Sequence, residues 1–91
     1  MSYADRYHPA AGVDLIARMR RFPILAERLQ RPDANPIATL LESSHATTRR
    51  LALFLCAHFY DGSAGGVDIV DLLQRTDAAN KAALLAYLAE I

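Results

Sequence analysis

One cysteine and two histidines near the middle of the chain are the residue types that could support nucleophilic or metal chemistry. Cys56 and His58 stand two residues apart in the most apolar stretch, and His45 precedes Cys56 by eleven residues. On a helix, at roughly 100° per residue, Cys56 and His58 point about 160° apart and cannot share a ligand or a proton. His45 lies about 16 Å along the axis from Cys56, whereas zinc bonds measure about 2.0–2.3 Å. We therefore expect no metal and no cofactor, and a partly buried, hydrogen-bonded His58.

A glycine-rich stretch after this apolar run also contains chemistry-bearing residues. The sequence "DGSAGGVDIVD" spans residues 61–71 and contains three aspartates. Apolar residues and glycines occupy positions where a calcium loop needs oxygen ligands. A phosphate-binding loop would need a preceding strand and a following Lys-Ser or Lys-Thr pair. We expect instead that Gly65 and Gly66 form a tight reversal and that Asp68 caps the next helix. No catalytic residue is predicted, so we expect a protein that is not an enzyme.

The elements that position these residues are predicted to be helical throughout. Apolar residues recur at helical spacing, and no window alternates as a strand does. Pro23 predicts a break at Phe22, and Asn35 before Pro36 predicts an N-cap followed by the first helical residue. Ser43 or Ser44 is the expected cap of the following helix, and Thr76-Asp77 is the expected cap of the last one. The expected helices cover residues 13–22, 23–30, 36 to about 41, about 45–60, 67–75 and 78–91.

Two of these helices carry patterns that predict which side faces the core. On the fourth helix the core arc comprises Leu51, Phe54, Leu55, His58 and Phe59. The opposite side carries Leu53, Cys56 and Tyr60, which we interpret as a possible interface. On the last helix the residues that align toward the core are Leu84, Leu85, Leu88 and Ile91, and an alanine face lies behind them, formed by Ala79, Ala82, Ala86 and Ala89.

Length and composition predict a small soluble protein of one domain. The chain has 91 residues, 53% of them hydrophobic and 22% charged, which argues against intrinsic disorder. A single cysteine cannot form an internal disulfide. The sequence has no apolar run long enough to cross a membrane and no secretory signal pattern, so we expect a cytoplasmic location. The predicted fold is all-α, a compact bundle of five or six short helices over residues 1–91, with residues 1–11 as a loose arm.

The charge is balanced overall but uneven along the chain. Residues 1–50 hold eight arginines and five acids, 8 − 5 = +3, and residues 51–91 hold two basic and five acidic residues, 2 − 5 = −3. Such halves can attract each other within one fold or between two copies. A possible nucleic-acid patch comprises Arg18, Arg20, Arg21, Arg28 and Arg31. A recognition helix is not predicted, because the helix after the glycines presents Asp68 and Asp71 to a polyanion.

Residues 49–77 also resemble a family of small helical bacterial proteins of unknown function, often found on plasmids and mobile elements. The residues that carry the resemblance are Arg49, Arg50, Ala52, Phe54, Leu55, Ala57, Gly65, Gly66, Asp68, Asp71, Leu72 and Asp77. His58, Phe59 and Leu73 stand where the family tends to have tryptophan, and Tyr60 where it tends to have asparagine. The resemblance implies a helical fold and a bacterial origin, and it supplies no activity or cofactor.

Arg49 and Arg50 are unfavourably placed at the start of a helix, where the helix dipole is positive. We therefore expect at least one of them to pair with Asp68 or Asp71 across the glycine turn. Such a pair would fix the angle between the two helices, and charge reversal at Arg49 or Arg50 would lower the melting temperature.

These observations favour a helical protein-protein interaction or regulatory module that self-associates as a homo-oligomer. The alternative is an accessory nucleic-acid-binding protein of a mobile element that uses the arginine patch. The expected partner is another protein or a second copy of this chain. Nucleic acid is the alternative partner, and no membrane is expected.

Overall fold

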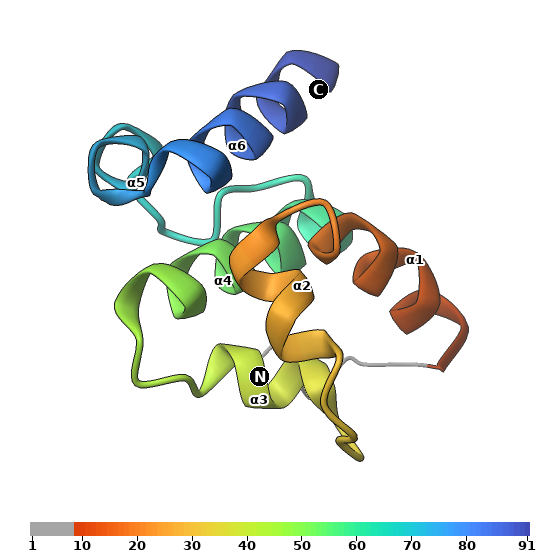
Figure 1. Cartoon of the computed structure of the whole chain (residues 1–91). Coiled ribbons are helices and arrows are strands. Elements are labelled where there is room, and N and C mark those ends of the chain that lie inside the picture. Colours follow the sequence, from red (N-terminus) through yellow and green to blue (C-terminus); the bar gives the residue numbers. More distant parts are fainter. Residues whose placement is uncertain (1–8) are drawn as a thin grey trace.

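The computed structural model describes residues 9–91, with side chains from residue 13 onward, and this part of the chain consists of helices and loops. The helices are α1 (Pro9–Met19), α2 (Pro23–Leu29), α3 (Pro36–Leu41), α4 (Ala46–Asp61), α5 (Ile69–Arg75) and α6 (Ala78–Glu90). The predicted all-α bundle is confirmed. In Figure 1, α5 and α6 lie together on one side of the loop that follows α4, and α1 to α4 lie on the other side.

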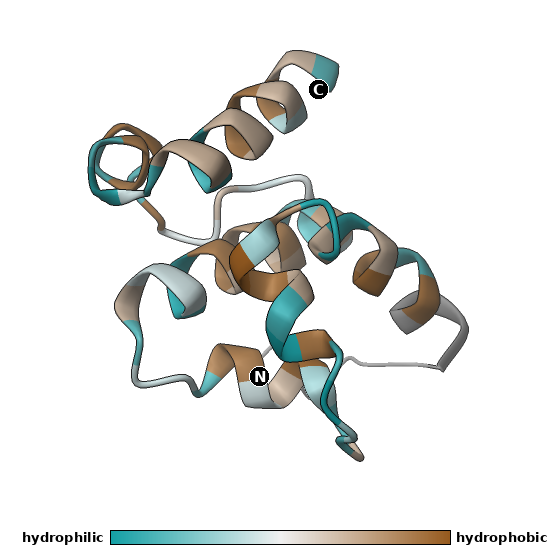
Figure 2. Cartoon of the chain, viewed as in Figure 1, coloured by the Kyte–Doolittle hydropathy of each residue, from teal (hydrophilic) through white to brown (hydrophobic). Residues whose placement is uncertain are grey.

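The central element is α4, which packs against α1, α2, α3 and α5. All six helices contribute buried side chains to one hydrophobic cluster, from Leu15 in α1 to Tyr87 in α6. Figure 2 shows hydrophobic ribbon on α4 and on the faces of the helices around it. A helix covered on several sides needs apolar residues around most of its circumference. This explains why α4 carries an uninterrupted apolar run from Leu51 to Ala57.

Helix starts follow the predicted local signals in most places. Asn35 caps α3, Asp68 caps α5 and Asp77 caps α6, and each side chain accepts a hydrogen bond from the backbone N–H three residues later. The break at Phe22 is also as predicted, because Phe22 is extended and α2 begins at Pro23.

The expected serine cap of α4 is wrong. His45 caps this helix, with its Nδ1 accepting from the Thr48 N–H at 3.3 Å. The Ser43 hydroxyl oxygen lies earlier in the loop and accepts from the His45 N–H at 3.2 Å, so Ser43 shapes the approach to the helix instead.

Two helix boundaries differ from the sequence pattern. Helix α1 begins at Pro9 rather than near residue 13, because Pro suits the first turn of a helix. The expected loose arm over residues 1–11 is therefore helical in its last three residues, and the remainder lies outside the described part of the chain. Helix α5 begins at Ile69 rather than Val67, because the Val67 N–H closes a turn onto the Ala64 carbonyl at 3.0 Å.

Helix α6 packs with a different face from the one predicted. Leu84 is buried as expected, but the other buried positions are Asn80 and Tyr87. Leu85 is 49% exposed and Ile91 is 60% exposed. This face is buried because Asn80 forms a hydrogen bond with another helix. The Asn80 Oδ1 accepts the Ile24 N–H at 3.0 Å, which serves the start of α2, where Phe22 offers no side-chain cap.

Candidate functional site

Cys56 and His58 occupy separate environments, as the helical spacing predicted. The Cys56 side chain is fully buried, and burial raises the pKa of its thiol to about 12. His58 is half-buried, and its Nδ1 lies 2.9 Å from the Tyr87 hydroxyl. Across the described residues, no group of three or more His, Cys, Asp or Glu side chains could hold a metal ion. On this helix the thiol packs in the core, and the imidazole is hydrogen-bonded to Tyr87.

The expected interface of Leu53, Cys56 and Tyr60 is not a free surface. Cys56 has no exposed area, and Leu53 and Tyr60 are only half-exposed. The Tyr60 ring packs edge-on against the Phe59 ring, with centroids 5.1 Å apart. The backbone of Gly65 lies against Leu53 and Ala57 on this side of α4. Cys56 therefore belongs to the core rather than to a surface, and the loop after α4 folds back against Leu53 on the side of the helix that the pattern left exposed.

The expected pairing across the glycine turn is present for one of the two arginines. The Arg50 guanidinium lies 3.3 Å from the Asp71 carboxylate, which also accepts from Arg75 Nε at 2.8 Å. Arg49 donates instead to the Ser43 carbonyl at 2.9 Å. Asp68 caps α5. Asp71 in the first turn of α5 therefore links this helix to α4 through Arg50. Arg49 holds the loop before α4.

The possible nucleic-acid patch is divided by intramolecular contacts. Arg18 donates to the Tyr87 hydroxyl at 3.0 Å, and its guanidinium carbon lies 5.0 Å from the centre of the Phe59 ring. Arg21 pairs with Glu90 and lies 5.4 Å from the centre of the Tyr87 ring. Arg20 is exposed in the turn that follows α1. Two of the five arginines thus hold α6 against the body of the protein.

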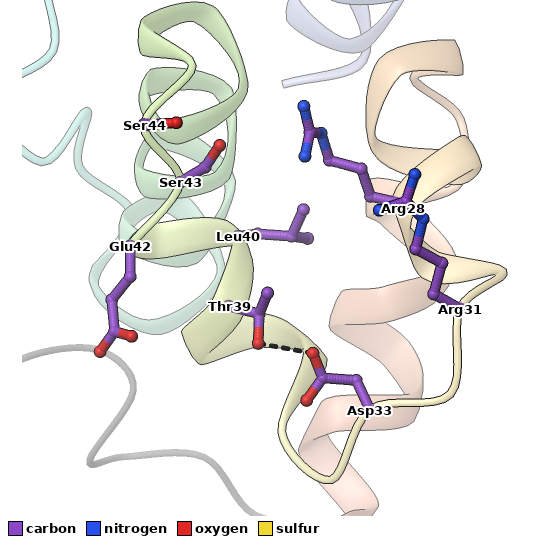
Figure 3. Close-up of a pocket in the computed structure, with 8 residues that line it drawn as sticks. All are labelled: Arg28, Arg31, Asp33, Thr39, Leu40, Glu42, Ser43 and Ser44. Atoms are coloured by element: carbon purple, nitrogen blue, oxygen red, sulfur yellow. Dashed lines mark hydrogen bonds between the residues drawn. The ribbon is translucent and has the colours of Figure 1, made fainter.

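The remaining two arginines of that set line a polar hollow of about 380 Å³ beside the end of α2. Arg28 and Arg31 form one wall, and the α3–α4 loop forms the other (Figure 3). The residues that line it are Arg28, Arg31, Asp33, Thr39, Leu40, Glu42, Ser43 and Ser44. The charge pattern of the sequence indicates the arginines but not the hydroxyl groups opposite them, because their proximity depends on how α2 and α3 pack against each other.

A second candidate surface is the outward face of α6. Its six side chains fall within roughly 120° of the helix circumference, at about 100° per residue. The exposed residues of this face are Ala78, Ala79, Ala82, Leu85, Ala86 and Ala89. The charged residues Lys81 and Glu90 flank the two edges of this arc, and Figure 2 shows how little hydrophilic ribbon α6 carries. We call these six residues the α6 face.

No family model, curated protein or solved structure matches the chain. The resemblance of residues 49–77 to a bacterial family, and the origin it implies, therefore stay expectations. Within the described residues, no helix is long and apolar enough to cross a membrane.

Proposed function

We propose that the protein is a non-enzymatic helical module that works by binding other protein surfaces, and that a second copy of itself is one such partner. The observation that carries this proposal is the α6 face, which is exposed and apolar along the whole helix. Soluble proteins seldom leave a continuous apolar strip uncovered unless something binds there. The proposal that the protein is not an enzyme is supported by the chemistry of α4, where the Cys56 thiol is buried and the His58 imidazole is hydrogen-bonded to Tyr87.

The residue pattern on the α6 face favours a second copy as the occupant. An antiparallel pair of α6 helices with its two-fold axis between positions 85 and 86 places Ala82 opposite Ala89 of the second copy. In the same register, Leu85 lies opposite Ala86 of the second copy. Small residues facing each other allow two helices to approach closely, and the larger leucine then fills the space above the facing alanine. The face is therefore self-complementary, as a two-fold interface requires.

The size of the α6 face predicts weak association. Thirteen helical residues span about 20 Å, and one helix pair buries less than the roughly 1,200 Å² at which stable interfaces begin. We expect a transient dimer with a dissociation constant in the high micromolar range. Such an interface suits a module that exchanges partners.

The test is the mass of the protein as a function of its concentration. Sedimentation equilibrium from about 10 µM to about 1 mM should show a mass that rises from 10.0 kDa toward twice that value. Leu85→Glu places a charge at the centre of the α6 face and should hold the protein as a monomer. Gln74→Glu adds the same charge at an exposed position of α5 and should behave as wild type.

A wild-type mass that stays at 10.0 kDa over the whole range would overturn self-association. Equal dimerisation of Leu85→Glu and wild type would show that copies associate through some other surface. Circular dichroism of both variants establishes that each is folded.

A further inference from the structure

We propose that the hollow between the end of α2 and the α3–α4 loop binds a phosphate monoester through Arg28, Arg31, Ser43 and Ser44. This inference is independent of the α6 face and concerns a different part of the molecule. The volume of the hollow, about 380 Å³, is enough for a phosphate group and a small attached moiety.

Arg28 and Arg31 are free to bind a ligand. Both side chains are exposed, and neither forms a hydrogen bond or ion pair with any residue that the structure describes. The three-residue spacing puts two like charges side by side at the end of α2, and like charges at this spacing repel each other. A bound anion between the two guanidinium groups removes this repulsion and gains charge-assisted hydrogen bonds.

The two carboxylates near the hollow do not neutralise the arginines. Asp33 accepts from the Asn35 N–H at 2.9 Å and from the Thr39 hydroxyl at 2.6 Å, and these two bonds lower the pKa of Asp33. Its oxygens therefore serve the turn before α3. Figure 3 shows Glu42 pointing away from both arginines. The wall formed by the arginines keeps its positive charge toward the hollow.

The opposite wall supplies hydroxyl donors on a loop that is held in place. The Ser43 oxygen accepts from the His45 N–H, which leaves its own hydrogen available to donate. Arg49 donates to the Ser43 carbonyl at 2.9 Å and anchors the loop to α4. Figure 3 shows the Ser43 and Ser44 side chains on the side of the hollow that faces Arg28, with Leu40 between the two walls.

Donors on two opposed walls favour a tetrahedral oxyanion over a carboxylate. One guanidinium satisfies both oxygens of a carboxylate in a single plane. A phosphate monoester has three terminal oxygens that point in different directions, so it can accept from the arginines on one side and from the serines on the other. The same chemistry is offered by a small phosphorylated molecule and by a phosphorylated serine of another protein.

The experiment is an NMR titration of the ¹⁵N-labelled protein at constant ionic strength with inorganic phosphate and with phenyl phosphate. Saturable shifts are expected at the amides of Ser43 and Ser44 and at the side-chain N–H groups of Arg28 and Arg31. Sodium acetate at equal ionic strength should produce no saturable shift there. Arg28→Gln and Arg31→Gln should each weaken phenyl phosphate binding about tenfold. Arg20→Gln, at an exposed position just after α1, is the control and should leave binding unchanged.

A phosphoserine peptide and a single-stranded oligonucleotide without a terminal phosphate separate the possible sources. Tighter binding of the peptide than of phenyl phosphate assigns the site to a phosphorylated protein, and equal binding assigns it to a small molecule. Binding of the oligonucleotide at least as tight as that of phenyl phosphate would overturn the monoester and favour phosphodiesters. Shifts that are absent from the hollow, or unchanged in Arg28→Gln and Arg31→Gln, would overturn the site itself.

Discussion

At the scale of single residues, the environment of Cys56 leads to a prediction about thiol chemistry. Burial raises the pKa of this thiol from 9.0 to about 12, so at pH 8 about one molecule in 10⁴ carries the reactive thiolate. Native protein should therefore react with a disulfide reagent far more slowly than protein unfolded in guanidinium chloride, which is the control. Rapid stoichiometric reaction of the native protein would contradict the buried position.

The same shift fixes the sign of a pH effect on stability. Because the pKa of Cys56 is higher in the folded than in the unfolded state, its contribution is complete below about pH 9 and is lost as the pH rises toward 12. Urea unfolding curves at pH 8 and pH 10 should therefore show lower stability at pH 10, and Cys56→Ala should reduce that difference.

The roles of single residues were predictable where the partner lies only a few positions away along the chain. The caps Asn35 and Asp68 each bond to a backbone N–H three residues later, so their roles could be predicted from spacing. His58 was expected to be hydrogen-bonded, but its partner Tyr87 lies 29 residues away. The signal available was chemical: a polar ring on the core side of a helix requires a polar partner, and a tyrosine on another helix can provide one.

At the scale of the elements, Gly65 determines how closely the loop after α4 approaches the helix. A Cβ at Gly65 would lie 2.7 Å from the Ala57 Cβ, and the residue has a φ of +62°. Gly62 has a similar φ of +68°, but a Cβ there would meet nothing within 4 Å. Gly62→Ala should cost about 1–2 kcal/mol for the backbone conformation, and Gly65→Ala about 1–3 kcal/mol more for the collision.

Thermal unfolding of the two variants checks this comparison. For a chain of this length each kcal/mol lowers the melting temperature by about 4–8 °C, so Gly65→Ala should melt clearly below Gly62→Ala. Equal melting temperatures would mean that the close approach between the loop and Ala57 contributes nothing.

The positions of the helices were predictable from periodicity. The buried faces were not predictable for a helix that other helices surround on most sides. The apolar stripe on α4 predicted Leu51, Phe54 and Leu55 as core, and all three are buried. Cys56 lies outside that stripe and is also buried, because α4 packs against α1, α2, α3 and α5 and so is covered around most of its circumference. A prediction from one apolar stripe assumes that the opposite face of the helix is exposed to solvent, and α4 does not satisfy that assumption.

At the scale of the whole molecule, polar contacts attach α6 to the other helices at three points. Asn80 bonds to the start of α2, Tyr87 bonds to His58 and Arg18, and Glu90 pairs with Arg21. This arrangement was not predictable from the spacing of the leucines on α6, because the polar partners lie on α1, α2 and α4. The consequence is that the leucine and alanine side of the helix stays exposed, which is the basis of the proposed self-association.

Of these three contacts, the one at Tyr87 should contribute most to holding α6 in place. Tyr87→Phe keeps the ring contacts with Phe22 and Phe54 but removes the hydroxyl, leaving a part-buried histidine and arginine without their partner. We expect a loss of about 1–3 kcal/mol and faster amide hydrogen exchange throughout α6. Glu90→Gln removes only an exposed ion pair and should cost less than about 1 kcal/mol, which makes it the matched control. If Glu90→Gln destabilises the protein as much as Tyr87→Phe, or if exchange in α6 is unchanged by Tyr87→Phe, then α6 is held by its apolar contacts and not by this hydroxyl.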